Sequence, residues 1–434
     1  MKRKDNRHLF NLLVAFSFTM IIILTPSCSN TKSASSQSEK ADMQATAEYK
    51  EERTGLPVVS ILVDLPTETV YSPDALTKTL SRMLGYGKDF SLLVEALPSS
   101  GQERDIAASR IRTEIMAGKG PDLFLCAQRM RGLSSGPDPF FKFPVKAMSN
   151  HIFMPLDNYI EKAEDIDWDS FQPVVMDAGR NKEGQQIIPL AYTFEVALFD
   201  RSYTPQAQFP MTWEQMTEDP DPNIRVATQG LIYNVIGDLA DYAKDVPAFS
   251  EEELLSWVAK QYETWQTIPT DSRDAKCYML DRQLLSSPNT DISLSGEQEY
   301  TMIPVYNMSG GVTANITTFA AVNRNARHPD EAFRIIEYLL DPEVQQTSSL
   351  FQDRMEGLPV YTGTGNADTP QNSYWQMNEV NYKAITAVQE QINVANFPGP
   401  LEACLWEVLW FDEDARKKSV HEQYVLMEML LAES

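Results

Sequence analysis

Apolar positions in the first part of the chain alternate between strand spacing and helix spacing. Residues 58–63 form a β-branched run that predicts a buried strand, and further strands are predicted at 90–97 and 121–125. Residues 105–117 have helical periodicity and are followed by Gly118, a predicted C-cap. The side chains expected on the core-facing side of this helix are Ile106, Ile111, Ile115 and Met116. Strands that alternate with helices predict a parallel sheet covered by helices.

The second half of the chain continues this alternation. Residues 187–200 are apolar and strand-like, and 251–265 predict an amphipathic helix. Residues 312–322 alternate apolar and polar side chains, which predicts a strand buried on one face. A helix is predicted directly after it, from Pro329 in its first turn to the stop at Asp341-Pro342. From about residue 374 the pattern is mostly helical.

Residues 134–148 interrupt the regular pattern with several prolines, and they predict an irregular insertion. Phe140, Phe141 and Phe143 lie within it. Such aromatic side chains either clasp a ligand or pin the loop to the core.

The first thirty residues have the layout of an export signal. A basic start is followed by an uncharged, largely apolar stretch at 9–24, which is shorter than a bilayer span. The sequence Leu-Thr-Pro-Ser before Cys28 resembles a bacterial lipobox, in which this cysteine becomes the lipidated N-terminus; the alternative is a plain signal peptide. Residues 29–50 are polar without periodicity and predict a flexible tether.

Composition narrows the class of protein. The 434 residues carry 37 Lys and Arg against 61 Asp and Glu, a formal net charge of −24. This argues against a nucleic-acid binder, because phosphate groups require a basic surface. If Cys28 is lipidated, Cys126, Cys277 and Cys404 remain, so at most one disulfide can form. No cysteine or histidine spacing suggests a metal, and no cofactor is predicted.

Motifs of common enzymes are missing from the sequence. It contains no GxSxG, HExxH or GxxxxGK[ST] segment. The four histidines are scattered, and one of them, His8, lies in the predicted signal peptide. Catalysis is therefore not expected, although the paired carboxylates of a glycan-active enzyme would not stand out among so many acidic residues.

Several different short motifs are spread along the chain. Residues 117–124 read AGKGPDLF, and residues 151–160 read HIFMPLDNYI. Further motifs lie at 188–200, 210–216 (PMTWEQM), 321–345 and 357–360 (GLPV). In this order they resemble the family-1 extracellular solute-binding proteins of bacterial ABC importers, which include maltose-binding and multiple-sugar-binding proteins. The resemblance covers most of residues 57–434.

This resemblance implies an α/β fold of the periplasmic-binding-protein (Venus flytrap) type, with two lobes and a ligand cleft between them. The chain is expected to cross between the lobes near residues 193–200 and 309–320. The expected domains are a lipoprotein signal peptide (1–27), a lipidated cysteine and tether (28–56), lobe one (57–190 and 312–350) and lobe two (191–311 and 351–434).

The same resemblance implies a role in solute import. The protein would capture a small solute, with a carbohydrate expected, and deliver it to the transmembrane permease subunits by an open-closed movement. It is expected to be a bacterial, monomeric non-enzyme, because ATP hydrolysis belongs to other importer subunits. Its lipid would hold it on the outer face of the cytoplasmic membrane.

Ligand contacts in this family lie at strand ends and crossings. At the first crossing the candidates are Tyr192, Thr193, Phe194 and Glu195. They offer aromatic faces for stacking and a carboxylate for paired hydroxyls. The alternative is that these residues only pack the hinge.

Further candidates come from the second crossing and the late region. Tyr306, Gly310 and Gly311 lie at the second crossing, where glycine lets the backbone approach a ligand, unless this is an ordinary turn. Trp375 lies where family members place a stacking aromatic, with core packing as the alternative. Trp213, in the TW motif, is expected to be structural.

The chain departs from maltose-binding members after the third predicted strand. Those members have an aromatic residue there, followed by acidic and basic groups, whereas this chain has Cys126, Ala127, Gln128, Arg129 and Met130. The missing aromatic argues against a maltodextrin ligand. Gln128 and Arg129 either bind a different sugar, such as an acidic one, or form a surface turn.

Two other functions remain open from the sequence. A surface adhesin or sensory receptor would use the same binding fold without import. An exported glycan-active enzyme is disfavoured by the missing motifs, and turnover of a glycan by the pure protein would revive it.

Overall fold

The chain was analysed as a computed structural model, in which Ala41–Ser434 form one compact unit separate from Met1–Lys40. The structure describes residues 42–65, 78, 80–82, 89–130, 138–229, 232–268, 279–285, 294, 296–353, 355–365, 373, 375–408 and 412–433. The predicted signal peptide, the predicted lipidation site Cys28 and Cys277 lie outside the described residues.

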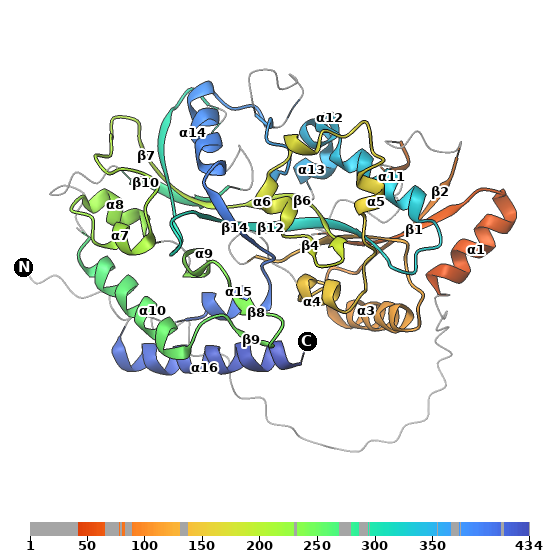
Figure 1. Cartoon of the computed structure of the whole chain (residues 1–434), viewed down its shortest axis with the longest axis horizontal. Helices are drawn as coiled ribbons and strands as arrows, with labels where there is room; N and C mark the ends of the chain where they lie inside the picture. Colours follow the sequence, from red (N-terminus) through yellow and green to blue (C-terminus); the bar gives the residue numbers. More distant parts are fainter. Residues whose placement is uncertain are drawn as a thin grey trace, which may run out of the picture. The chain divides into compact units, whose positions relative to one another are not determined.

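The large sheet has seven strands among the described residues (Figure 1). Their order is β13-β6-β12-β3-β1-β2, and β14 pairs with β12 outside this path. The strands are β1 (Val58–Asp64), β2 (Ser91–Ala96), β3 (Leu123–Ala127), β6 (Ile188–Thr193), β12 (Val312–Val322), β13 (Leu358–Pro359) and β14 (Ile392–Asn396). β2 and β3 flank β1 in parallel, as the sequence pattern predicts, whereas β12 is antiparallel to β3 and β6.

The small sheet has three antiparallel strands in the order β10-β7-β11. They are β7 (Glu195–Asp200), β10 (Met279–Leu284) and β11 (Tyr300–Pro304). Only Phe194 separates β6 from β7, so the chain passes from the large to the small sheet at that residue. It returns between β11 and β12. Two short hairpins are β4 (Arg180–Asn181) with β5 (Gly184–Gln185) and β8 (Ala240–Asp241) with β9 (Val246–Pro247).

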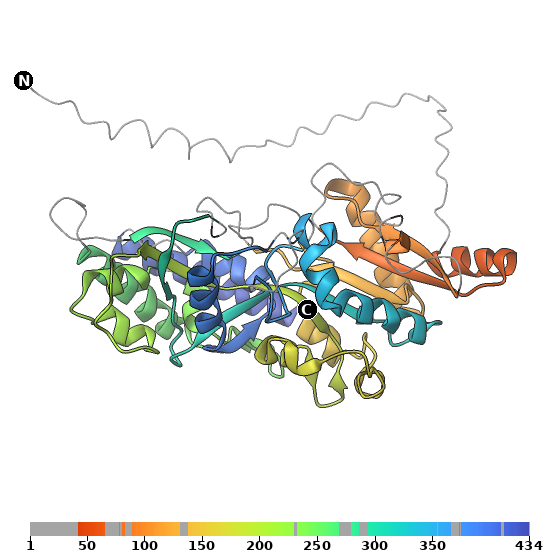
Figure 2. The same cartoon turned by 90° about the horizontal axis from the view of Figure 1, so that it is seen from above.

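Helices surround both sheets, and Figures 1 and 2 show α3 and α11 on opposite sides of the large sheet. Those before β7 are α1 (Met43–Thr54), α3 (Gly101–Met116), α4 (Pro144–Ser149), α5 (Asp157–Ile160), the 3-10 turn η1 (Trp168–Ser170) and α6 (Pro173–Asp177). Those between β7 and β12 are α7 (Trp213–Thr217), α8 (Pro222–Ala227), α9 (Ile232–Ile236) and α10 (Glu251–Gln266). The later ones are α11 (Pro329–Leu340), α12 (Pro342–Thr347), α13 (Ser349–Asp353), α14 (Glu379–Gln389), α15 (Pro400–Trp406) and α16 (Glu413–Ala432).

Several local signals in the sequence predict these elements correctly. α11 begins at Pro329, and its apolar residues with helical spacing are all buried: Ala332, Ile335, Ile336, Leu339 and Leu340. α7 begins with a capping box between Thr212 and Gln215, which satisfies two backbone N–H groups of the first turn. Trp213 is fully buried, in keeping with its expected structural role. None of the helices in the described residues is long and apolar enough to cross a membrane.

β12 corrects the prediction of a strand buried on one face, because all eleven of its residues are buried. Three of its polar side chains, Thr313, Asn315 and Thr317, bond to other polar groups of the protein, whereas Thr318 Oγ1 is buried without a partner among the described residues. Thr313 Oγ1 donates to the Asn234 carbonyl at 2.7 Å, and Asn315 Nδ2 donates to Asn234 Oδ1 at 2.8 Å. Period-two alternation shows which side chains share a face, but it does not show what covers that face.

A helix is present where the sequence predicts one at 105–117, but only half of its predicted core residues are buried. Ile111 and Ile115 are buried, whereas Ile106 is 62% exposed and Met116 is 88% exposed. The buried stripe of α3 also contains charged Arg104 and Glu114, which the apolar pattern misses. Gly118 caps the helix as predicted, with φ of +75°, a backbone conformation that glycine adopts without steric strain.

Part of the predicted irregular insertion is helical, because α4 occupies Pro144–Ser149. The aromatics before it pack against the core, as the pinning alternative expects. The ring of Phe141 lies edge-on to Phe124 at 5.1 Å and to Phe153 at 5.0 Å between centroids. The region after residue 374 is helical as predicted, except for β14, whose short alternating sequence was overlooked.

Residues 43–54 form α1, although the predicted tether includes them. The helix docks through Glu51, whose carboxylate accepts from Val58 N at 3.0 Å and faces His328 Nε2 at 2.6 Å; Arg327 is the third partner. Partial burial raises the pKa of Glu51, but the hydrogen bonds from Val58, Arg327 and His328 outweigh burial and lower the pKa overall.

We predict that Glu51→Gln lowers the unfolding free energy at pH 7 by about 1–3 kcal/mol, because it weakens three hydrogen bonds to a buried charge. The Glu51 pKa is lower in the folded than in the unfolded protein. Its contribution is therefore present above about pH 4.3 and is lost as the pH falls through the folded pKa. Denaturant unfolding of Glu51→Gln and of Glu48→Gln, an exposed neighbour on α1, measures this. Equal stability of the two variants at pH 7 would contradict it.

Candidate functional site

The carboxyl ends of β1 and β3 meet at one edge of the large sheet, where ligands bind in open α/β folds. Asp64 ends β1 opposite Cys126 of β3. The Asp64 carboxylate is 1% exposed and receives both Nη groups of Arg104 at 2.9 Å. Phe140 N at 2.8 Å and Arg129 Nη2 at 3.2 Å complete its partners. The segment after β3 is thus fixed to the end of β1.

A buried polar network lies where the chain passes between the two sheets. Asn234 of α9 is its centre, because its Nδ2 donates to Glu195 Oε2 at 2.9 Å while its Oδ1 accepts from Asn315 Nδ2. Glu195 opens β7, and Asn315 lies within β12. One amide therefore joins both crossing segments to α9. Burial and the nearby charges of Glu402 and Glu195 raise the pKa of the adjacent Tyr233.

A second amide network lies at the start of β12. Asn307 Nδ2 donates to Thr313 Oγ1 at 3.1 Å and to Asn393 Oδ1 at 2.8 Å. Asn393 lies in β14 and packs directly over Gly311, where a Cβ would be only 2.1 Å from its Cγ. Gly311 is therefore required for the close approach of β14 to the start of β12.

Beside these networks is a cavity of about 190 Å³. Lys142, Phe143 and Val145 line one side. The other side is formed by 238–240, Tyr242 and 395–401. The Phe143 and Tyr242 rings meet edge-to-face with centroids 6.4 Å apart, and burial raises the pKa of Tyr242 to about 12. Aromatic faces, the Asn396 amide and the Asp238 carboxylate thus converge on one space.

Outside the cavity, Lys146 connects α4 to the turn between β8 and β9 and to α16. Its Nζ contacts Asp245 Oδ1 at 2.7 Å and donates to the Leu431 carbonyl near the end of α16, also at 2.7 Å. Lys146 belongs to α4, whereas Asp245 lies in the turn between β8 and β9. A cation near a helix C-terminus also has a favourable interaction with the helix dipole.

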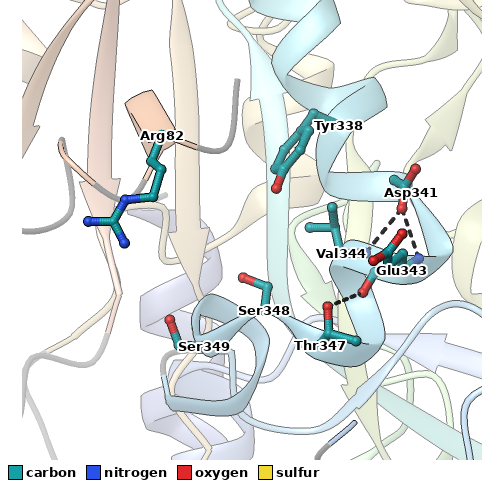
Figure 3. Close-up of a pocket in the computed structure, with 8 residues that line it drawn as sticks. All are labelled: Arg82, Tyr338, Asp341, Glu343, Val344, Thr347, Ser348 and Ser349. Atoms are coloured by element: carbon teal, nitrogen blue, oxygen red, sulfur yellow. Dashed lines mark hydrogen bonds between the residues drawn. The ribbon is translucent and has the colours of Figure 1, made fainter. Parts of the chain in front are cut away.

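Two larger cavities lie elsewhere in the described part of the chain. One of about 470 Å³ lies between Arg82 and α11–α13, and Figure 3 shows Arg82 across it from Tyr338. Its Asp341 carboxylate already caps α12 by accepting from Glu343 N and Val344 N. The other, about 740 Å³, is a mainly apolar groove along α3, α4 and the end of α16. Neither is lined by a strand of the two sheets, whereas Ala395 and Asn396 of β14 line the 190 Å³ cavity, which is therefore the preferred candidate.

The four candidates of the first crossing are all buried. The Tyr192 hydroxyl accepts from Gln389 Nε2 at 2.7 Å, and Thr193 Oγ1 donates to the Leu285 carbonyl at 2.7 Å. Phe194 is fully buried, and Glu195, 5% exposed, binds Asn234. None of the four lines the 190 Å³ cavity, so ligand contact by these residues remains a prediction.

The candidates of the second crossing and late region are also packed into the protein. The Tyr306 hydroxyl donates to Gln391 Oε1, and its ring stacks on Phe209 at 5.9 Å between centroids. Gly310 has φ of +81°, while Gly311 packs under Asn393. Trp375 is buried, and its indole Nε1 has no hydrogen-bond partner among the described residues.

Gln128 and Arg129 lie at the strand end as predicted from their position after β3. Gln128 Nε2 donates to the Phe141 carbonyl at 3.2 Å, and Arg129 contacts Asp64. The Gln128 side chain also faces Gly399 of the cavity wall, because a Cβ there would be 3.8 Å from Gln128 Oε1. Gln128 therefore lies beside the candidate cavity, although neither Gln128 nor Arg129 lines it.

Sequence reasoning missed the residues that line the far side of the cavity. Tyr242, Asn396 and Phe397 come from a hairpin and from the end of β14, elements that the sequence analysis did not assign. Asn234 has no motif that distinguishes it from other asparagines. Within the described ranges, no group of three or more His, Cys, Asp and Glu side chains is arranged to hold a metal ion.

Comparison with solved structures identifies the fold. An extracellular solute-binding protein of family 1 from Alicyclobacillus acidocaldarius matches with a TM-score of 0.55 at 12% identity, covering 87% of this chain and 98% of that chain. A periplasmic oligogalacturonide-binding protein from Yersinia enterocolitica matches at 0.53 with 13% identity, covering 87% and 99%. The sugar-binding protein MalE from Xanthomonas citri matches at 0.51 with 13% identity, covering 87% and 98%.

The chain therefore has the two-lobed α/β fold of these proteins, and the predicted resemblance in fold is confirmed. Another matching structure, with a TM-score of 0.53, is described as a designed esterase, so the fold alone does not exclude catalysis. No protein-family model matches the chain, and no curated protein matches it.

We predict that Asn234→Asp destabilises the protein at pH 7 by about 1–3 kcal/mol, because it places a second carboxylate against Glu195 in a buried site. Because the loss comes from repulsion between two charged carboxylates, it should shrink as the pH falls towards 4 and carboxylates gain protons. Denaturant unfolding at both pH values measures it, with exposed Asn325→Asp as the control for the same chemical change. A loss that is independent of pH would rule out the proposed repulsion.

Proposed function

We propose that the protein is an extracellular solute-binding protein that captures a small solute, with a carbohydrate expected, in a cleft between two lobes. The observation that carries this proposal is the 190 Å³ cavity, whose lining combines the segment after β3 with residues at the end of β14, in a fold used by solute-binding proteins. Ligands of two-lobed proteins bind where both lobes can contact them.

The proposed lobes are 57–190 with 312–350, and 191–311 with 351–434. With this division, Lys142 and Phe143 reach the cavity from lobe one, and Tyr242 and Phe397 reach it from lobe two. The cavity is smaller than the roughly 300–1,000 Å³ of typical ligand sites. A sugar would therefore enter when the lobes move apart, and it would be enclosed when they close.

The lining of the cavity supports a carbohydrate. Aromatic rings stack on the apolar faces of sugar rings, and amide and carboxylate groups pair with hydroxyls. The cavity offers the rings of Phe143 and Tyr242 together with Asn396 and Asp238. Two of the matched structures are described as binding oligogalacturonide and sugar.

In this proposal the protein is a monomeric lipoprotein of an ABC importer. Cys28 would be lipidated, and the lipid would hold the protein on the outer face of the cytoplasmic membrane. The closed form would dock on the transmembrane permease subunits. The protein itself would carry out no reaction and would require no cofactor or nucleic acid.

We predict that the chain from residue 29 onward binds at least one mono- or oligosaccharide, which raises its melting temperature because the ligand binds only the folded state. A thermal-shift screen, followed by calorimetric titration, measures this. Tyr242→Ala should weaken binding by roughly 10-fold or more. Tyr49→Ala, which removes an exposed tyrosine on α1, is the control. Absence of a shift with every carbohydrate, in folded protein free of copurified ligand, would overturn the carbohydrate assignment.

We also predict that Lys146→Met shifts the lobes towards an open arrangement, because it removes a cation that contacts Asp245 and Leu431 across the proposed cleft. The apparent affinity for the sugar found in the screen should fall several-fold, in proportion to the lost closed population. Small-angle X-ray scattering should give a larger radius of gyration without ligand and the original value at saturation. Lys244→Met is the control, since the Lys244 ion pair with Asp241 is local and exposed. An unchanged radius of gyration would contradict the proposal that Lys146 holds the lobes together.

A further inference from the structure

Arg129 has hydrogen-bonding capacity that the folded protein does not use. Its side chain is 11% exposed, and Nη2 contacts Asp64, but the buried Nη1 has no partner among the described residues. The neighbouring Gln128 is 1% exposed, and its Oε1 is likewise buried without a partner. Buried polar atoms are nearly always paired, so a donor and an acceptor left unused on adjacent residues require an explanation.

The orientation of the Gln128 amide is fixed by its surroundings. Nε2 donates to the Phe141 carbonyl, so an exchange of the two amide atoms would bring two oxygens together. Oε1 therefore stays an acceptor. The amide oxygen of Gln128 lies beside the cavity wall at Gly399, and the guanidinium of Arg129 is on the next residue along the chain.

The charge around this pair is not balanced. Arg104 and Arg129 both contact Asp64, which is buried and already accepts four hydrogen bonds. Two guanidinium groups therefore share one buried carboxylate. In a chain with a net charge of −24, this local excess of positive charge is unusual.

We propose that Arg129 and Gln128 bind the carboxylate and a neighbouring hydroxyl of an acidic sugar, so that the solute is a uronic acid or an oligosaccharide that contains one. This inference rests on the proposed function and adds the class of solute. The carboxylate accepts from Arg129 Nη1, which is a charge-assisted hydrogen bond, and its charge balances the surplus guanidinium. The sugar hydroxyl donates to Gln128 Oε1.

Arg104 and Arg112 act indirectly in this proposal. Arg104 is saturated by Asp64 and the carbonyls of Pro98 and Asp138, and Arg112 donates to the Phe140 carbonyl. Both contribute positive potential without contacting the sugar. Asp64 is a positioning residue, because it holds Arg129 through one Nη group and leaves the other available.

The test compares sugars that differ only in the carboxylate. Galacturonate and glucuronate, with their di- and trisaccharides, are titrated calorimetrically into the chain from residue 29 onward, alongside the matched galactose and glucose compounds. The acidic member of at least one pair should bind roughly 10- to 100-fold more tightly than its neutral partner. This preference should fall as salt increases.

Variants assign the preference to Arg129. Arg129→Gln should remove most of the acidic-over-neutral preference. Asp64 still has Arg104 and Phe140 N in this variant, so the strand end stays paired. Arg129→Lys should restore part of the preference, because it keeps the charge but lacks the planar fork. Arg324→Gln, which removes an exposed arginine paired with Glu183, is the matched control and should change nothing.

The outcomes separate the two proposals. Neutral sugars that bind as tightly as their acidic partners would overturn the acidic-solute inference and leave the solute-binding proposal intact. An acidic preference that Arg129→Gln does not change would overturn the assignment to this residue. If no sugar of either kind binds to folded protein, both proposals fail for carbohydrates.

Discussion

The large sheet depends on one strand, β12, because three other strands pair with it. Its first half pairs with β14, and its second half lies between β3 and β6. Every residue of β12 is buried, so its polar side chains require partners within the protein. Asn234 and Asn307 supply partners for Thr313 and Asn315, which explains why amides gather where the chain passes between the sheets.

The same constraint positions the candidate site. Gly311 lets Asn393 lie directly over the start of β12, and β14 then leads into the cavity wall at Asn396. On the other side, Asp64 holds the segment after β3 through Phe140 N, and that segment carries Phe143 into the cavity. The cavity is therefore the place where two rigidly fixed segments face each other. Rigid positioning of this kind is what a binding site requires.

Buried charge is used sparingly and in pairs around this site. Arg104 and Asp64 satisfy each other in a forked ion pair, and Glu195 is paired with an amide. Arg129 is different, because half of its guanidinium fork is satisfied and half is not. In the acidic-solute proposal, the carboxylate of the solute completes this set of partners.

The sequence by itself determined the local elements and the fold class. The spacing of apolar residues predicts β1, β3 and α11, and the ordered motifs predict a two-lobed α/β fold, because both signals are local. Only the tertiary structure decided which faces are covered and which distant residues meet. Thus β12 is buried on both faces, Ile106 is exposed, and Asn234, Tyr242 and Asn396 meet near residues far away in the chain. Burial and contact depend on what packs against a segment, and periodicity within the segment does not contain that information.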